Sequence, residues 1–173
     1  MRAILVLAVL VLSLGAVGCN SSKKASAKAT STELVTGVDP LKRLDKPAEY
    51  DNKIVLRLER TSCFGTCPVY TIVIYEDGTG IYEGRTHANL EGQHGFKLDN
   101  VQELLDQAKA INYMGFDDVY EKPVSDFPTC YTYVRLGKER KQIRDYRGAP
   151  AELKAFEKLI DERVFATKMS PLY

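Results

Sequence analysis

The chain lacks an excess of charge of either sign. Its 173 residues include 24 Lys and Arg against 23 Asp and Glu. Loss of residues 1–18 would remove Arg2 and no acid, which makes the two numbers equal. Nucleic-acid-binding proteins neutralise phosphates with a basic surface, so a near-neutral chain is a poor polyanion binder. We therefore expect no nucleic-acid partner.

The chain also lacks the short motifs of common enzymes, namely a nucleophile–base motif, a phosphate loop or a metalloprotease helix. It has only two histidines, His87 and His94, and we expect both in solvated loops. An irregular stretch gathers the acidic residues Asp117, Asp118, Glu121 and Asp126. A hydrolase that uses this stretch is a third hypothesis, behind the two given below. We expect a non-enzymatic protein with no cofactor and no metal.

The N-terminal apolar run is too short to span a membrane, which takes about 20 residues. Residues 3–14 form this run after the positive start Met1-Arg2, as in a secretory signal. The small residues that follow end in Ala16-Val17-Gly18-Cys19, which resembles the lipobox of bacterial lipoproteins. That resemblance implies cleavage after residue 18 and acylation of Cys19. The alternatives are a plain cleaved signal or an uncleaved anchor.

Acylation would attach the protein to a membrane without a transmembrane helix. Each buried CH₂ contributes roughly 0.8 kcal/mol, so two or three acyl chains suffice. Asn20 stands where some bacteria use Asp for inner-membrane retention, and we therefore expect the outer membrane, facing the periplasm. Residues 19–49 would be the lipidated cysteine and a flexible tether rich in Ser, Ala, Thr and Lys. Residues 50–173 would form a single domain.

We expect this domain to be α+β, with a mostly antiparallel sheet of five to six strands and two helices on one face. The predicted element order is β-β-β-(β)-α-β-β-α. Alternation and β-branched content predict strands over residues 54–59, 69–75, 80–85, 130–136 and 140–146, and more weakly over 92–98. Hairpin turns are predicted at residues 76–80 and at Gly137-Lys138. Residues 117–129 should be irregular.

The two predicted helices have clear start signals. Asp99 would cap the first helix in a capping box with Gln102, and Gly115 would end it. Its apolar stripe comprises Val101, Leu104, Leu105, Ala108 and Ile111. Pro150 would open the second helix. Its buried face comprises Leu153, Phe156, Ile160 and Val164.

The chain is organised around the stretch from Thr61 to Tyr70, which contains Cys63 and Cys67. Residues 64–66 would form a three-residue hairpin loop between two strands. The two cysteines would then face each other with Cα atoms about 4.5–5.5 Å apart, as a disulfide requires. In an oxidising compartment this bond should form and clip the hairpin, fixing the register of its strands.

Two sharper functions for these cysteines stay open. The first is redox exchange, although the Cys-x₃-Cys spacing differs from that of thioredoxin-like sites. The second is a zinc site that adds Cys130 and either His87 or His94. Cys130 itself is expected to be a buried free thiol, and intermolecular pairing is its alternative.

The run from Leu58 to Tyr70, with its Cys-Phe-Gly-x-Cys-Pro core, resembles the opening of an uncharacterised bacterial family, domain-of-unknown-function family 6438. Further stretches that fit the same pattern are residues 74–79, 82–84, 126–129, 146–150 and 160–161. The resemblance covers about residues 52–163. It implies a small secreted or lipoprotein-type protein and carries over no activity. Cys130 is not part of the pattern.

These features predict a lipid-anchored cell-envelope protein that acts as a binding or structural module. Its partners would be the membrane, through the acyl chains on Cys19, and an envelope protein or peptidoglycan-associated component. Possible binding residues are Asp126, Tyr70 and Tyr82. Packing also explains the strand tyrosines, and a turn cap explains Asp126. The alternative function is a thiol–disulfide redox protein that uses Cys63 and Cys67.

Overall fold

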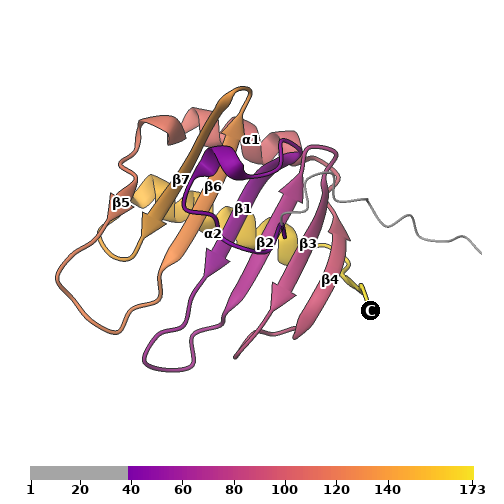
Figure 1. The fold of residues 1–173 in the computed structure, drawn as a ribbon, viewed down its shortest axis with the longest axis horizontal. Coiled ribbons are helices and arrows are strands. Elements are labelled where there is room, and N and C mark those ends of the chain that lie inside the picture. Colours follow the sequence, from indigo (N-terminus) through magenta and orange to yellow (C-terminus); the bar gives the residue numbers. More distant parts are fainter. Residues whose placement is uncertain (1–38) are drawn as a thin grey trace, which may run out of the picture. The chain divides into compact units, whose positions relative to one another are not determined.

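A computed structural model describes residues 39–173, and one eight-stranded sheet runs through this part of the chain (Figure 1). Neighbouring strands follow the order β5-β7-β6-β1-β2-β3-β4-β8. The strands are β1 (Ile54–Arg60), β2 (Tyr70–Tyr75), β3 (Thr79–Gly84), β4 (Gly92–Lys97), β5 (Val119–Tyr120), β6 (Cys130–Leu136), β7 (Glu139–Asp145) and β8 (Ser170–Pro171). The helices are α1 (Val101–Ala110) and α2 (Ala151–Phe165), with the short 3₁₀ helices η1 (Pro47–Glu49) and η2 (Tyr113–Gly115).

The predicted α+β class and the mostly antiparallel sheet are confirmed, but the strand count of five to six is too low. The two extra strands, β5 and β8, have two residues each and lie at the sheet edges. Strands this short show no alternation in sequence. β5 lies in the stretch that was predicted to be irregular, and it pairs with β7 in parallel. The weakly predicted strand over residues 92–98 is confirmed as β4. His94, which was expected in a solvated loop, therefore lies in a strand, where it pairs with Pro171 of β8.

Both helices cover the same face of the sheet (Figure 1). From the central strands, Leu56, Leu58, Ile72 and Ile74 point into this layer and are fully buried. The helices contribute the predicted residues Leu104, Ala108, Leu153, Phe156, Ile160 and Val164. Each of these side chains except the smaller Ala108 contributes roughly 1.5–3 kcal/mol by leaving water. The main core therefore lies between the helices and one face of the sheet.

Residues 39–50, here called the strap, cross the opposite face of the sheet, where Figure 1 shows them in indigo. Tyr50 packs on Tyr133 with ring centres 4.6 Å apart. Its hydroxyl donates to Gln142 Oε1 at 2.9 Å and accepts from the Leu44 amide at 2.9 Å. Most of the strap falls within residues that were predicted to be tether. The folded part of the chain thus includes residues from 39 onward.

The first helix begins and ends differently from its prediction. Its N-cap is Asn100, whose side chain accepts a hydrogen bond from the Glu103 amide at 3.3 Å. Asp99 therefore makes no capping box. The helix ends before Asn112, which adopts the left-handed conformation with φ of 54°. Gly115 instead lies in η2.

The predictions for the N-terminus lie outside the described residues. They are the signal peptide at 1–18, acylation of Cys19, and the tether up to residue 38. In the part of the chain that the structure covers, neither helix has the length and apolar character needed to cross a membrane.

Candidate functional site

The loop between β1 and β2 contains the predicted disulfide. Cys63 and Cys67 are bonded, with Cα atoms 5.7 Å apart. The ring they close is exposed, and Phe64 at its tip is 90% solvent-accessible. The disulfide is therefore confirmed, and it lies at the end of the sheet.

The loop is longer than the predicted three-residue hairpin. Strand pairing stops at Arg60 and Tyr70, several residues before the cysteines. Beyond this point the Thr61 amide donates to the Thr129 carbonyl at 3.0 Å, and the Val69 amide donates to the Thr86 carbonyl at 2.9 Å. The two arms diverge because each bonds to an outer neighbour. The disulfide thus clips the loop, whereas the backbone ladder sets the register of the strands.

A group of three polar side chains lies where this loop joins the end of β1 and the start of β2. Arg60 donates from Nη2 and Nε to Asp161 Oδ2 of α2, at 2.6 and 3.0 Å. Tyr70 donates from its hydroxyl to Asp161 Oδ1 at 2.8 Å. Burial raises the pKa of Tyr70, the Arg60 charge opposes this in part, and the Asp161 carboxylate adds to it. Tyr70 therefore stays protonated and acts as a donor that holds α2 on the sheet.

Of the three residues predicted as possible binding residues, only Tyr70 and Tyr82 lie together. Tyr70 and Tyr82 lie side by side with ring centres 5.7 Å apart, and both pack against Phe165. Their exposed fractions are 5% and 0%, which places both rings in the core. Asp126 lies in the exposed loop between β5 and β6, with φ of 73°.

A small cavity of ≈ 180 Å³, here called the sheet-end cavity, lies beneath α2 where β6 starts and β7 ends. Its lining consists of Arg60, Phe127, Pro128, Thr129, Cys130, Asp145, Tyr146, Arg147, Lys154 and Glu157. Asp145 and Glu157 are each only 3% exposed. Burial, and the nearby carboxylate of Asp145, raise the pKa of Glu157 to about 7.

The sequence analysis did not predict Glu157 as a site residue, although its position in the helix gave a signal. It stands four residues after Leu153 and three before Ile160, on the predicted buried stripe of α2. A carboxylate on such a stripe must find a partner, and Glu157 accepts from Thr132 Oγ1 at 3.0 Å. A charged residue at a position of the apolar stripe could therefore have indicated a buried polar group in this region.

Cys130 is a buried free cysteine, as predicted. Burial, and the nearby Glu157, raise the pKa of its thiol well above the ordinary value. The thiol is therefore protonated at neutral pH and is a poor nucleophile. Within residues 39–173 no group of three or more His, Cys, Asp or Glu is placed to hold a metal ion.

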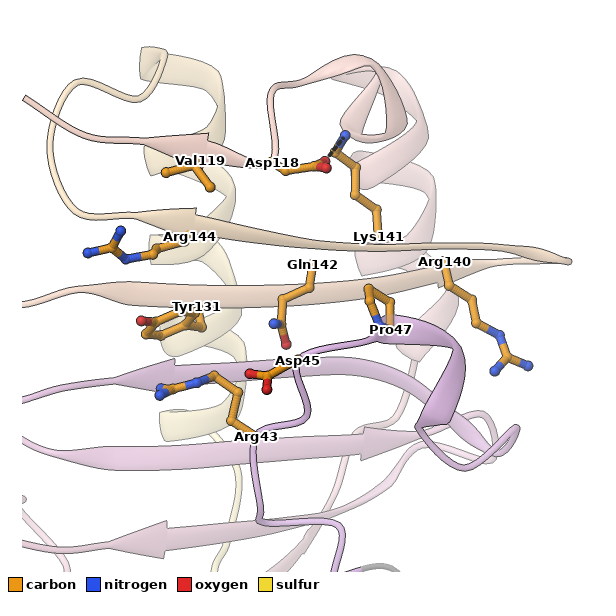
Figure 2. Close-up of a pocket in the computed structure, with 10 residues that line it drawn as sticks. All are labelled: Arg43, Asp45, Pro47, Asp118, Val119, Tyr131, Arg140, Lys141, Gln142 and Arg144. Carbon is orange, nitrogen blue, oxygen red and sulfur yellow. Dashed lines mark ion pairs between the residues drawn. The ribbon is translucent and has the colours of Figure 1, made fainter.

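A larger cavity of ≈ 550 Å³ lies on the strap face over β6 and β7 (Figure 2). We call it the basic cavity. Its lining consists of Arg43, Asp45, Pro47, Asp118, Val119, Tyr131, Arg140, Lys141, Gln142 and Arg144. Four cations thus face two carboxylates, so the lining has a net positive charge.

Three head groups gather at one end of the basic cavity (Figure 2). The Arg43 guanidinium lies 3.9 Å above the centre of the Tyr131 ring. Arg144 is the register partner of Tyr131 across β6 and β7. Figure 2 shows Arg140 at the other end, with its head group pointing away. Arg43, Tyr131 and Arg144 therefore form a group of neighbouring donors at this end of the cavity.

The acidic partners of these arginines leave them accessible. Arg43 Nη1 donates to Glu59 Oε1 at 3.1 Å. Arg144 donates from Nη1 and Nη2 to the two carboxylate oxygens of the exposed Glu121, at 2.9 and 3.3 Å. A guanidinium has five donors, so Arg43 keeps N–H groups for a ligand. The Arg144–Glu121 pair is bidentate but lies in solvent, where water and salt screen it, so a ligand anion can compete with Glu121 for Arg144. Sequence reasoning missed both arginines, although Arg140, Gln142 and Arg144 alternate along one face of β7.

The chain has a detectable relationship to one protein family. No curated protein and no solved structure matches it. The family described as a domain of unknown function (DUF6438) matches residues 54–164, which is more than half of the chain and nearly the whole sheet with both helices. The matched range includes every residue that lines the sheet-end cavity, from Arg60 to Glu157. The chain belongs to the DUF6438 family.

Proposed function

We propose that this protein is a lipid-anchored module of the bacterial cell envelope that binds an anionic envelope component in the basic cavity and catalyses no reaction. The observation that carries the proposal is the group of Arg43, Tyr131 and Arg144. Guanidinium groups bind carboxylates and phosphates through paired N–H donors. The ligand chemistry is therefore a carboxylate or phosphate group on a larger component.

Hydrogen bonds from β7 fix the strap, and with it the position of Arg43. Gln142 Nε2 donates to the Leu44 carbonyl at 3.2 Å, next to Arg43 in the chain. Arg140 Nη1 donates to the Ala48 carbonyl at 3.0 Å. The face of β7 that carries Arg144 thus also fixes the strap that carries Arg43. A site ordered before binding loses less entropy when the ligand arrives.

The lipid anchor is supported by the sequence Ala16-Val17-Gly18-Cys19. Acyl chains on Cys19 would hold the domain at the membrane, where envelope components are concentrated. Membrane fractionation and mass spectrometry of the N-terminus test this part. We expect wild-type protein in the membrane fraction with an acylated Cys19, and the Cys19→Ser variant in the soluble fraction. An unmodified N-terminus on the wild-type protein would contradict the anchor.

Anion binding is tested by titrating the full-length processed protein, in a neutral detergent, with phosphate, a phosphate monoester and acetate. Calorimetry should detect binding that weakens with salt. Arg43→Gln and Arg144→Gln should each weaken it at least tenfold. The matched control is Arg163→Gln, because Arg163 forms an exposed ion pair with Glu103 between the helices. No binding by wild type, or an equal loss in the control, would contradict the proposal.

The second candidate is thiol–disulfide exchange at Cys63 and Cys67. One observation favours it: the disulfide lies in an exposed loop and does not hold the strands together. A redox bond must be reachable, and its opening must leave the fold intact. The reduction potential of the bond separates this candidate from a structural clip.

A further inference from the structure

We propose that Glu121 is an internal competitor for the basic cavity. Its carboxylate holds the Arg144 guanidinium in the free protein, and a bound anion takes its place. Because this inference rests on the proposed anion binding, it adds a regulation to that same site: a carboxylate of the chain keeps Arg144 partly closed. The supporting observations are the geometry of the Arg144–Glu121 pair, its place at the sheet edge and its contrast with the Arg43–Glu59 pair.

Glu121 makes the contact with Arg144 that a ligand anion would make. Two nitrogens of the guanidinium, Nη1 and Nη2, donate to the two carboxylate oxygens at 2.9 and 3.3 Å. Paired donors of this kind are the way in which a guanidinium recognises a carboxylate or a phosphate group. A ligand anion that uses both donors of Arg144 must therefore displace Glu121.

The carboxylate is the movable member of this pair. Arg144 lies within β7, which pairs with β6 on one side and with β5 on the other. Glu121 directly follows the two-residue strand β5 at the edge of the sheet, and its side chain is 52% exposed. Exposed side chains change rotamer within nanoseconds. Rotation of the Glu121 side chain into solvent is therefore enough to open Arg144.

The acidic partner of Arg43 lies in a different setting and stays in place. Glu59 belongs to the central strand β1, and its side chain is only 13% exposed. It also accepts a hydrogen bond from Arg57 Nη2 at 3.0 Å, and the Arg57 side chain is buried. Glu59 is thus fixed from two sides, whereas Glu121 is displaceable. Access to the group of donors is therefore regulated at Arg144.

The size of the effect follows from the weakness of exposed ion pairs. A ligand that binds only the open form has its apparent affinity reduced by the fraction of molecules in which Arg144 is open. Solvent screening and side-chain entropy limit what an exposed pair such as Arg144–Glu121 contributes. Glu121 should therefore weaken anion binding by about two- to sixfold without abolishing it.

The first test is calorimetric titration of the full-length processed protein, in a neutral detergent, with inorganic phosphate. Glu121→Gln should bind phosphate about two- to sixfold more tightly than wild type. The matched control is Asp45→Asn, because Asp45 lines the basic cavity and forms no ion pair within residues 39–173. This control removes a negative charge without releasing an arginine, so it should tighten binding less than Glu121→Gln does.

The outcomes separate this inference from the proposed function. Equal affinities of wild type and Glu121→Gln would overturn the competition and leave anion binding intact. Equal or greater tightening by Asp45→Asn would reduce the Glu121 effect to its charge and would also overturn the competition. No phosphate binding by wild type or by Glu121→Gln would overturn both proposals.

The second test observes the contact itself through the ¹³C resonance of the Glu121 carboxyl group. The Arg144→Gln variant without phosphate gives the position of this resonance when Glu121 has lost its partner. In wild type, saturating phosphate should move the resonance toward that position. The Glu162 carboxyl group, paired with Lys158 on α2, is the internal control and should not move. An unmoved Glu121 resonance at saturation would show that phosphate binds beside Glu121, which overturns the inference.

Discussion

Arg60, the last residue of β1, donates two hydrogen bonds to a single oxygen of Asp161 in α2, from Nη2 at 2.6 Å and from Nε at 3.0 Å. The other oxygen of Asp161 accepts from Tyr70, the first residue of β2. One carboxylate therefore joins the ends of two adjacent strands to a helix about a hundred residues later in the chain. The disulfide loop is the segment between these two strand ends.

Asp161→Asn should destabilise the fold by about 2–3 kcal/mol, because it leaves the Arg60 cation mostly buried without a counter-ion. Removing one partner of a fully buried pair costs about 3–5 kcal/mol, and partial exposure of Arg60 and Asp161 reduces this value. Urea denaturation measures the loss. The control is the next residue, Glu162→Gln, whose exposed pair with Lys158 should give no measurable change. Equal effects of the two variants would show that Asp161 does not act as a buried anchor.

Replacing Cys63 and Cys67 together with Ser should lower the free energy of unfolding by about 2 kcal/mol, the loop-entropy value for so short a ring. The sheet should persist, because backbone hydrogen bonds to Thr129 and Thr86 hold the two arms. Circular dichroism and urea denaturation test both statements. A global loss of the fold would show that the disulfide does more than clip the loop.

The reduction potential of the same disulfide separates the structural and redox roles. A clip should have a potential below about −300 mV, since structural disulfides of secreted proteins resist reduction. Equilibration with dithiothreitol or glutathione buffers, read by thiol trapping, gives this value. A potential near those of exchange proteins, roughly −120 to −270 mV, would favour thiol–disulfide exchange at Cys63 and Cys67.

The sequence predicted the central elements because their signals are local. The alternation from Ile54 to Glu59 and the apolar stripe of α2 predicted a strand and a helix that the structure contains. The strand was expected to be half-buried, but it is buried on both faces from Ile54 to Leu58, because the strap covers its second face. The strap could not be predicted in this way. Leu41 is nearly alone as an apolar residue among polar ones, and its burial depends on Val73 and Tyr133 far along the chain. β5 and β8 likewise exist only through their pairing partners.

The sites were harder to predict than the fold for the same reason. The basic cavity joins Arg43 of the strap to Arg144 of β7, and only the folded chain brings them together. The tyrosines and Asp126 were chosen for residue type and local context. The structure then places Tyr70 and Tyr82 in the core, whereas Asp126 lies in an exposed loop.

The start of α1 offers a matched pair of adjacent substitutions. Asn100→Ala should destabilise the protein by about 1 kcal/mol, because Asn100 accepts the hydrogen bond from the Glu103 amide. Asp99→Ala should cost less than about 0.5 kcal/mol, since only the weak interaction with the helix dipole is lost. Thermal or urea denaturation of both variants measures the difference. A larger loss of stability for Asp99→Ala would show that Asp99 caps the helix, as the sequence predicted.

Glu157 should make stability depend on pH in the direction opposite to an ordinary ion-paired carboxylate. The groups around it are Cys130 and Thr132 of β6, Asp145 of β7, Lys154 and Asp161 of α2, and Arg60 of β1. Its pKa is raised from 4.5 to about 7 in the folded state. Between these values the folded chain binds more protons than the unfolded chain, so the free energy of unfolding falls as pH rises.

Glu157→Gln removes this titration and keeps an acceptor for Thr132 Oγ1. A shift of this size corresponds to at most about 3 kcal/mol, which wild type should lose between pH 4.5 and pH 8 relative to the variant. The amide carries no charge, so no ionised carboxylate is buried beside Asp145 at high pH, and the variant should be the more stable protein at pH 8. Urea denaturation at pH 5 and pH 8 gives the difference, with Glu162→Gln as the exposed control. Parallel pH profiles for wild type and Glu157→Gln would mean that Glu157 is ionised in the folded protein throughout this range.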